Sequence, residues 1–338
     1  MSCLLSAGHR VTVISHLRAY LGDAANTVGW SHLQAAALLE QDRIATLWAN
    51  AGVPDLWFCY HPYYKSPDLI GPALAARFHL PYVTCEASYS RRRNIGIWAD
   101  MQARALDAVR LATINICLTK RDRLGLHEAA PNARLAPLSP FIVTDAFDAD
   151  PAPRAGHMVC VAMMRPGDKF ASYQRLAATL SRLPGDLDWH LSVAGDGPMM
   201  ADVQALFDAL PASRITWLGK LDHHQIAALL ATGSLYVWPG CGEAYGLAYL
   251  EAQAAGLPVV AQATAGVPEV VAHGKTGFLT PAGDDAAAAA AITRILTDAA
   301  LQQTMGQAAR HHARKTHGQP QAARRLDRLL MDAIGARP

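Results

Sequence analysis

Residues 239–266 read PGCGEAYGLAYLEAQAAGLPVVAQATAG, and this stretch decides the fold that we predict. An apolar run that ends at Trp238 predicts a buried strand, and the loop after it is rich in glycine and proline. Helical spacing begins near Gly246, and Pro258–Ala261 predicts the next strand. A strand, a loop, a helix and a strand in this order are typical of a parallel α/β sheet.

The start of this predicted helix suits an anion with hydroxyl groups on either side. The N-terminus of a helix offers free N–H groups and the positive end of its dipole, and Gly246 allows a ligand to approach closely. Glu243 lies in the loop and Glu251 lies one to two turns into the helix. Because carboxylates accept hydrogen bonds from hydroxyls, we expect a ligand in which sugars flank a phosphate.

Strands and helices alternate along the whole chain, which predicts parallel βαβ units. A proline-rich segment, residues 136–156, indicates a domain boundary, which we place at residue 150. We therefore expect an N-terminal domain over 1–150, a second domain over 151–320 and a C-terminal helix over 321–338. In the first domain, the predicted strands are His9–Ser15, Pro54–Tyr60, Pro81–Cys85 and Thr113–Leu118, and the predicted helices are Leu33–Ala51, Asp68–Phe78 and Ile97–Val109.

The second half shows the alternation more clearly. A helical tail runs from Leu301 to Ile334 and breaks at Gly318–Pro320, because proline interrupts a helix. The predicted strands are Met158–Met163, Trp189–Ala194, Ile215–Leu218, Ser234–Trp238, Pro258–Ala261 and Gly277–Thr280. The predicted helices are Ser172–Leu183, Met200–Leu210, His223–Ala231, Leu247–Ala255, Val267–Val271 and Asp284–Thr297.

Composition excludes several classes of protein. The 338 residues are 51% hydrophobic and 17% charged, so a sizeable core can form and disorder is excluded as the main state. A net charge of +2 gives no global field for nucleic acid. The six cysteines are scattered without a C-x-x-C pair, which argues against a metal cluster or a disulfide framework. With no apolar run long enough for a membrane span and no secretory signal, we expect a cytoplasmic protein.

Five segments in the same order resemble the retaining glycosyltransferases of family 4, the glycosyl transferases group 1, which have the GT-B fold. The resemblance covers residues 158–300 most strongly. It implies two Rossmann-like domains whose parallel sheets face a central cleft. The segments are AGDGP at 194–198, WLGKL at 217–221, the E-x7-E motif from Glu243 to Glu251 with its flank GLPVV at 256–260, GVPEVV at 266–271, and GKTGFL at 274–279.

The resemblance implies a role for each matching residue in the second domain. Glu251 would bind the ribose hydroxyls of the nucleotide, and Glu243 would bind hydroxyls of the donor sugar. The N–H groups of Gly246 and Leu247 would hold the distal phosphate, while Tyr245 lines the sugar pocket. The same resemblance adds three residues to the expected donor site, namely Gly195, Gly219 and Leu221.

A basic pair is expected beside the diphosphate. Arg165 and Lys169 follow the first strand of the second domain, at the edge of the sheet where ligands bind in open α/β folds. Such a pair neutralises the departing diphosphate, so the resemblance implies no metal and no other cofactor. The segment MMRPGDKF departs from the family pattern: Met164 replaces the usual glycine, and the basic residues are four positions apart rather than five.

The first domain is expected to bind the acceptor, which is a glycan, a lipid-linked sugar or a small molecule. The resemblance places His61, at the end of a predicted strand, close to the donor sugar as a catalytic residue; the alternative is an ordinary loop histidine. Glu86 follows the next strand, where many relatives have histidine. The run Arg91, Arg92 and Arg93 is interpreted as a solvated loop, with contact to a phosphorylated lipid or an anionic membrane surface as the alternative.

The chain begins at what we interpret as a helix end, CLLSAGHRVTV. The family normally has a first strand, a glycine-rich loop and most of a helix before this point. We therefore expect a sequence that is truncated at its N-terminus and a sheet with an exposed edge. The long C-terminal tail is expected to cross back onto the first domain.

These observations favour a retaining glycosyltransferase that uses a UDP- or GDP-sugar. The reaction implied by the resemblance needs no protein nucleophile, because the departing diphosphate accepts the proton of the acceptor. The alternatives are a nucleotide-sugar-binding relative without activity and a nucleotide-sugar epimerase on the same fold. Neither the sugar nor the acceptor follows from the residues.

Overall fold

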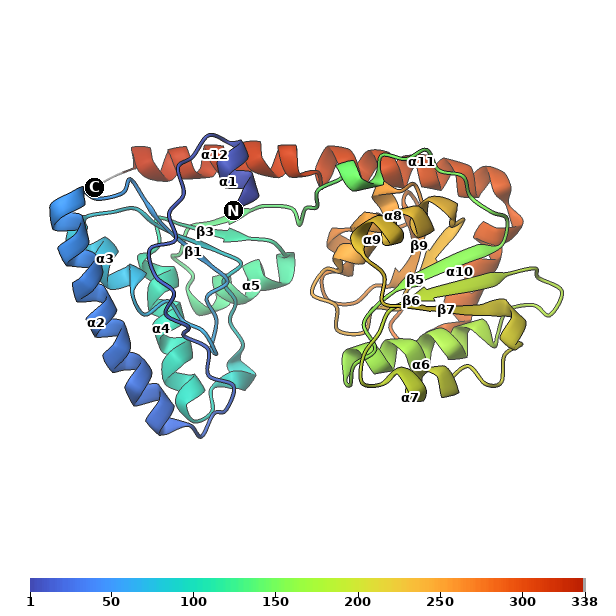
Figure 1. Ribbon diagram of the computed structural model, residues 1–338, viewed down its shortest axis with the longest axis horizontal. Helices are drawn as coiled ribbons and strands as arrows, with labels where there is room; N and C mark the ends of the chain where they lie inside the picture. The colour runs from blue at the N-terminus through green and yellow to red at the C-terminus, as the bar shows by residue number, and fades with distance from the viewer. Residues whose placement is uncertain (337–338) are drawn as a thin grey trace. The chain divides into compact units, whose positions relative to one another are not determined.

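The computed structural model describes residues 1–336, which form two compact units (Figure 1). Unit 1 comprises residues 1–139 together with the chain from residue 322 onward, and unit 2 comprises Pro140–Gln321. The division falls between Ser139 and Pro140, upstream of the boundary predicted at residue 150. Each unit holds one parallel sheet covered by helices. Within residues 1–336, no helix is long and apolar enough to cross a membrane.

Unit 2 is built on a six-stranded sheet of order β10-β9-β8-β5-β6-β7, with every pair parallel. All six predicted strands of this half are confirmed. Because helices cover both faces, the central strands are almost continuously buried. The strands are β5 (His157–Val161), β6 (His190–Ala194), β7 (Ile215–Gly219), β8 (Leu235–Val237), β9 (Val259–Gln262) and β10 (Gly277–Thr280).

Two layers of helices enclose this sheet (Figure 1). On one face lie α6 (Asp168–Leu180), α7 (Met200–Ala205) and α10 (Asp285–Thr297). The other face carries α8 (His223–Thr232), α9 (Leu247–Ala254) and α11 (Ala299–Thr316). The predicted helix at Val267–Val271 is only the short 3-10 turn η4 (Val267–Glu269), and the helix predicted over Met200–Leu210 ends at Ala205.

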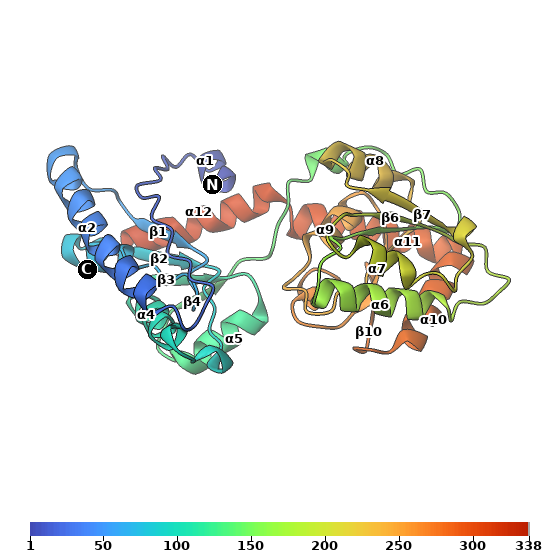
Figure 2. The ribbon, with the colours of Figure 1, turned by 60° about the horizontal axis from the view of Figure 1, so that its bottom comes forward.

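Unit 1 has a four-stranded parallel sheet of order β1-β2-β3-β4. The predicted strands β1 (Trp57–Tyr60), β2 (Tyr82–Cys85) and β3 (Ile114–Cys117) are confirmed. Two elements were not predicted: β4 (Leu135–Pro137), which has only three residues, and α5 (Lys120–Ala129), in which only Leu126 is buried. Helix α2 (Thr27–Ala51) packs along α3 (Gly71–Phe78) and α4 (Ile97–Leu111), and Figure 2 shows α2 beside α4.

The strand predicted at His9–Ser15 is wrong. Helix α1 (Ser2–Ser6) is followed by Gly8 with a φ of +87°, as the predicted helix end requires, but residues 9–23 form no strand. The segment lies against α2 instead, where the Arg43 guanidinium donates a hydrogen bond to the Ile14 carbonyl. Alternating β-branched residues give strand propensity, yet a strand forms only beside a partner, and none of the described strands pairs with this segment.

Two connections leave unit 2 side by side. The predicted break in the tail is confirmed, because α11 ends at Thr316 and α12 (Gln319–Gly335) begins after Gly318. The Ile142 N–H donates to the His317 carbonyl at 2.9 Å, and the Gln319 N–H donates back to Ile142 at 2.9 Å. The buried His317 ring also lies 2.6 Å from the Pro140 carbonyl. From residue 322, the chain belongs to unit 1.

Candidate functional site

The strand order of unit 2 identifies one position at the carboxyl ends of its strands where a ligand is expected. Along the chain, β5 is followed by β6 and β7 on one side, after which the chain crosses to β8 on the other side of β5. In open α/β sheets, ligands bind at the carboxyl ends of the strands where the order reverses in this way. The loops after β5 and β8, which carry the basic pair and Glu243, therefore start from neighbouring strands.

Lys169 and Glu243 meet at this switch point. Helix α6 begins at Asp168, earlier than predicted, so that Lys169 lies in its first turn. The Lys169 ammonium forms an ion pair with the Glu243 carboxylate, and the Trp238 indole N–H donates to the same oxygen at 3.2 Å. The two charged side chains are only 18% and 16% exposed, so solvent screens their pairing little. Both contacts are made to one oxygen, Oε1, of the Glu243 carboxylate, so a positive charge is held beside this group.

Hydrogen bonds from two neighbouring segments shape the loop around Glu243. The Cys241 N–H donates to the Ser172 hydroxyl at 2.9 Å, and the Thr264 hydroxyl donates to the Gly240 carbonyl at 3.0 Å. Helix α9 then begins after Gly246, whose φ of +74° favours glycine, and no side chain caps the helix. The Tyr249 N–H donates to the Gly246 carbonyl at 3.1 Å, so the N–H groups of Leu247 and Ala248 are the ones available to an anion at this helix start.

Glu251 projects from α9 and is partly buried. Burial is the main cause that raises the pKa of its carboxyl group, while His223, at the start of α8, opposes the shift. Tyr245, in the loop before α9, is also partly buried, and Leu247 is exposed. A carboxylate in a drier environment forms stronger hydrogen bonds with hydroxyl groups, which suits the expected binding of a ribose.

The other expected donor residues lie at the ends of β6 and β7. The Gly195 N–H donates to the Gly219 carbonyl at 2.8 Å, which joins the two strand ends. A side chain at Gly195 would meet the Ala162 carbonyl oxygen at 1.9 Å, so only glycine fits there. Leu221 follows on the same segment and is partly buried. Arg165 lies exposed in the loop after β5 and forms no ion pair with a carboxylate of residues 1–336.

Trp238 and His223 belong to this site and were not singled out from the sequence. Trp238 ends the strand before the E-x7-E loop, but an apolar strand end does not reveal that its indole N–H will reach back to Glu243. His223 is remote from Glu251 in sequence, and only the folded chain brings its charge close enough to act on the Glu251 carboxyl group. Neither contact leaves a signal in residue spacing.

In unit 1, two neighbouring strands end in strained residues. His61 follows β1 and Glu86 follows β2, and their φ values of +59° and +60° are unusual for residues other than glycine. The His61 Nδ1 atom lies 3.5 Å from Glu86 Oε2, and this carboxylate raises the pKa of the imidazole. Residues held in such backbone conformations cluster at functional sites, so this pair is a candidate for one.

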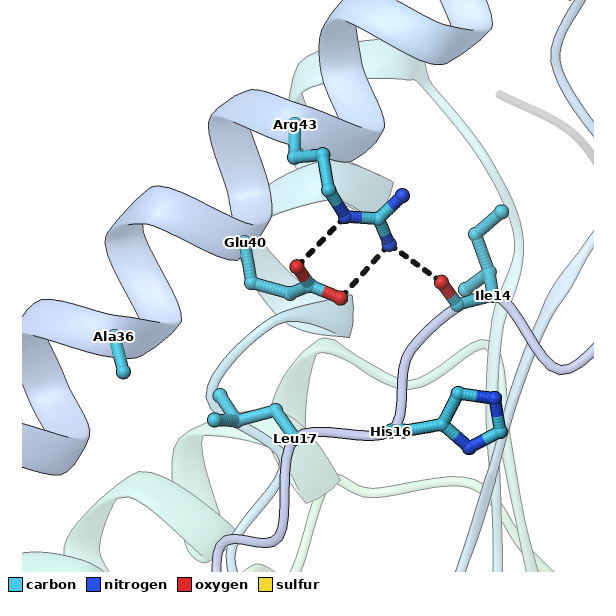
Figure 3. Close-up of a pocket in the computed structure, with 6 residues that line it drawn as sticks. All are labelled: Ile14, His16, Leu17, Ala36, Glu40 and Arg43. Carbon is cyan, nitrogen blue, oxygen red and sulfur yellow. Dashed lines mark hydrogen bonds and ion pairs between the residues drawn. The ribbon is translucent and has the colours of Figure 1, made fainter.

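A cavity of about 450 Å³ lies elsewhere in unit 1, between α2 and the irregular segment before it (Figure 3). None of the predicted site residues lines it. Two of its charged groups pair with each other: the Arg43 guanidinium donates to both oxygens of Glu40 and also to the Ile14 carbonyl. The pairing with Arg43 lowers the pKa of Glu40 to about 2. We interpret these contacts as a clamp that fastens the segment to α2 rather than as a ligand site.

Known proteins resemble this chain both in sequence and in fold. Residues 171–312 match the family described as Glycosyl transferases group 1. The chain is 33% identical over 147 residues to the sulfoquinovosyl transferase SQD2 of Arabidopsis thaliana, which covers 43% of this chain and 28% of that protein. It is 31% identical over 202 residues to the GDP-mannose-dependent alpha-(1-6)-phosphatidylinositol monomannoside mannosyltransferase of Mycolicibacterium smegmatis, covering 54% of this chain and 52% of that protein. The chain thus spans about half or less of the length of these relatives.

Solved structures share the architecture at low identity. Sucrose-phosphate synthase from Thermosynechococcus elongatus superposes with a TM-score of 0.67 at 19% identity, over 90% of this chain and 79% of that one. HepE of Anabaena, in complex with UDP, superposes with a TM-score of 0.69 at 16% identity, over 87% of this chain and 82% of that one. The expected GT-B fold, with two Rossmann-like units, is confirmed.

Proposed function

We propose, because residues 171–312 belong to the glycosyl transferases group 1 family, that this chain transfers a sugar from a nucleoside diphosphate sugar to an acceptor. We further propose that the donor is a UDP- or GDP-sugar and that the anomeric configuration is retained. One observation carries the proposal most: the ion pair of Lys169 with Glu243 lies at the switch point of the unit 2 sheet, beside the uncapped start of α9.

Each group at this site has a role in the proposed reaction. The first-turn N–H groups of α9 and the Lys169 ammonium hold the diphosphate and stabilise the charge that builds up as the sugar–phosphate bond breaks. Glu251 accepts hydrogen bonds from the ribose, and Glu243 accepts them from the sugar while it orients Lys169. Arg165 is free to turn toward the phosphate, because no ion pair with a described carboxylate holds it.

The proposed transfer needs no metal, since protein cations neutralise the leaving group. The departing phosphate takes the proton of the acceptor hydroxyl as the new bond forms, and the protein contributes orientation and charge stabilisation. His61, held by Glu86 at the strand ends of unit 1, is proposed to lie at the acceptor side of the reaction.

Product analysis tests this proposal. The chain is incubated with UDP- and GDP-sugars and with a panel of acceptors, once with EDTA and once without it. We expect free nucleoside diphosphate and a glycoside whose anomeric proton coupling matches that of the donor, in both conditions. An isomerised donor sugar would instead indicate an epimerase, and bound nucleotide without any product would indicate an inactive relative. A product of inverted configuration would refute the retaining reaction.

A further inference from the structure

Lys65 of unit 1 lies inside a cage of aromatic rings. Its Nζ atom is 4.7 Å from the ring centroid of Trp98, 5.7 Å from that of Tyr64 and 6.0 Å from that of Tyr20. Each ring attracts the ammonium through its negative face. The charge of Lys65 is therefore held in place by rings, which do not neutralise it as a carboxylate would.

Two further cations share these rings. The Arg93 guanidinium lies 5.5 Å from the ring of Tyr64, and the Arg18 guanidinium lies 5.5 Å from the ring of Tyr20. Arg18, Lys65 and Arg93 form what we call the cation cluster. Across residues 1–336, no carboxylate lies within 4.0 Å of any of its three charges. Three like charges gathered without a counter-charge favour the binding of an anion.

The cluster is assembled from segments that are far apart in sequence. The Leu21 N–H donates to the Lys65 carbonyl at 2.9 Å, and the Trp98 indole N–H donates to the Leu21 carbonyl at 3.0 Å. These bonds fasten the loop that carries Arg18 to the loop after β1 and to α4. The segments that carry Arg18 and Lys65 are thus joined to each other and to α4 by hydrogen bonds, while the Arg18 and Arg93 side chains are exposed to solvent.

A line of rings connects the cluster to the end of β1. The rings of His61 and Tyr63 lie 4.8 Å apart, and the rings of Tyr63 and Tyr64 lie 5.3 Å apart. Tyr64 in turn contacts Lys65 and Arg93. Tyr64 therefore lies between Tyr63 and two of the cations, Lys65 and Arg93. Aromatic rings of this kind pack well against the apolar face of a sugar.

We propose that the cation cluster binds a phosphate group of the acceptor, so that the acceptor is a phosphate-bearing saccharide. A phosphate monoester carries about −1.5 to −2 charges at neutral pH and offers three strong acceptor oxygens, whereas a carboxylate carries one charge. Three cations match the phosphate better, and the two arginines present the planar fork that phosphate accepts. The identity of the bound molecule as the acceptor rests on the proposed function, since that function places His61 at the acceptor side.

Calorimetric titration of the full chain tests the proposal directly. The probes are glucose 1-phosphate, a short-chain polyprenyl diphosphate glucose in detergent, methyl glucoside, inorganic phosphate, and anionic phospholipid vesicles that contain no sugar. The variants are Lys65→Met and Arg93→Gln. Their matched controls are Lys315→Met, on exposed α11 surface, and Arg104→Gln, on the exposed face of α4. UDP and GDP are titrated into every variant as well.

We expect at least one phosphorylated sugar to bind, with affinity at least about tenfold lower in both cluster variants and unchanged in both controls. Binding of the free sugar phosphate or of the lipid-linked one alone names the source of the phosphate. Equal binding of methyl glucoside, of inorganic phosphate or of the vesicles would overturn the proposal, and so would unchanged affinity in the variants. If Lys65→Met fails to fold, the exposed Arg93→Gln carries the test.

The nucleotide titrations separate this inference from the proposed function. Loss of UDP and GDP binding in the unaltered chain, with sugar phosphate binding intact, would refute the donor site and leave the phosphate site standing. Normal nucleotide binding without any binding of a phosphorylated sugar would refute the phosphate site alone.

Discussion

Replacing Lys169 by methionine should destabilise unit 2 through the carboxylate that loses its partner. Breaking a fully buried ion pair costs about 3–5 kcal/mol. The side chains of Lys169 and Glu243 are 18% and 16% exposed, and Trp238 still donates to the carboxylate, so we expect about 2 kcal/mol. For a domain of this size, that loss lowers the Tm by about 4–8 °C. Scanning calorimetry of Lys169→Met measures it.

A double-mutant cycle identifies the cause. Glu243→Gln removes the negative charge but keeps an oxygen for the Trp238 N–H, so it should cost about 1 kcal/mol. The double variant should lose about 1–2 kcal/mol less than the two single losses together, because neither charge remains without a partner. Arg165→Met, exposed and without an ion pair to a described carboxylate, is the control and should change stability by less than about 0.5 kcal/mol. Single losses that add within about 0.5 kcal/mol would refute the reasoning.

Three further predictions follow from other residues. Burial raises the pKa of Glu251, so nucleotide affinity should fall on acidification from a pH above the usual carboxyl range, and calorimetric titration should show no such fall in Glu251→Gln. Burial lowers the pKa of His317 to about 4, whereas the unfolded chain takes up the proton near 6.5. The free energy of unfolding should therefore drop by about 3 kcal/mol as the pH falls from about 6.5 to about 4. In urea denaturation, His317→Asn, which keeps a donor for the Pro140 carbonyl, should show a weaker dependence of this free energy on pH. Gly195→Ala places a methyl group 1.9 Å from the Ala162 carbonyl oxygen and should lower the free energy of unfolding by about 2–3 kcal/mol. Gly185→Ala, where the new methyl group has open space, should change this free energy little. Equal effects of the two substitutions in urea denaturation would contradict the close contact at Gly195.

The sequence predicts unit 2 well because local signals there agree with the final fold. The strand before Trp238, the glycine-rich loop and the helix start near Gly246 are each encoded within a few residues, and the parallel alternation leaves few topologies. The carboxyl ends of β5 and β8 then bring Lys169 to Glu243. Residue spacing alone could not show that these two charges pair directly.

Unit 1 was less predictable, because its features depend on contacts between distant segments. The HRVTVIS run has strand propensity, but pairing decides whether a strand forms, and Ile14 is held by Arg43 of α2 instead. The cation cluster forms only when the loops around Arg18 and Lys65 are tied together through Leu21. The pairing of His61 with Glu86 follows from β1 and β2 being neighbours, which the alternation suggested but did not fix.

The donor site in unit 2 is tested by the thermal stability of the purified chain with UDP, GDP and their sugars, with Glu251→Ala as the matched control. A ligand that binds only the folded state raises the Tm by mass action, by an amount that grows with its concentration above Kd. We expect a concentration-dependent rise in Tm with one nucleoside diphosphate, and we expect this rise to disappear in Glu251→Ala. A well-folded chain that shows no rise with any nucleotide would contradict the donor site in unit 2.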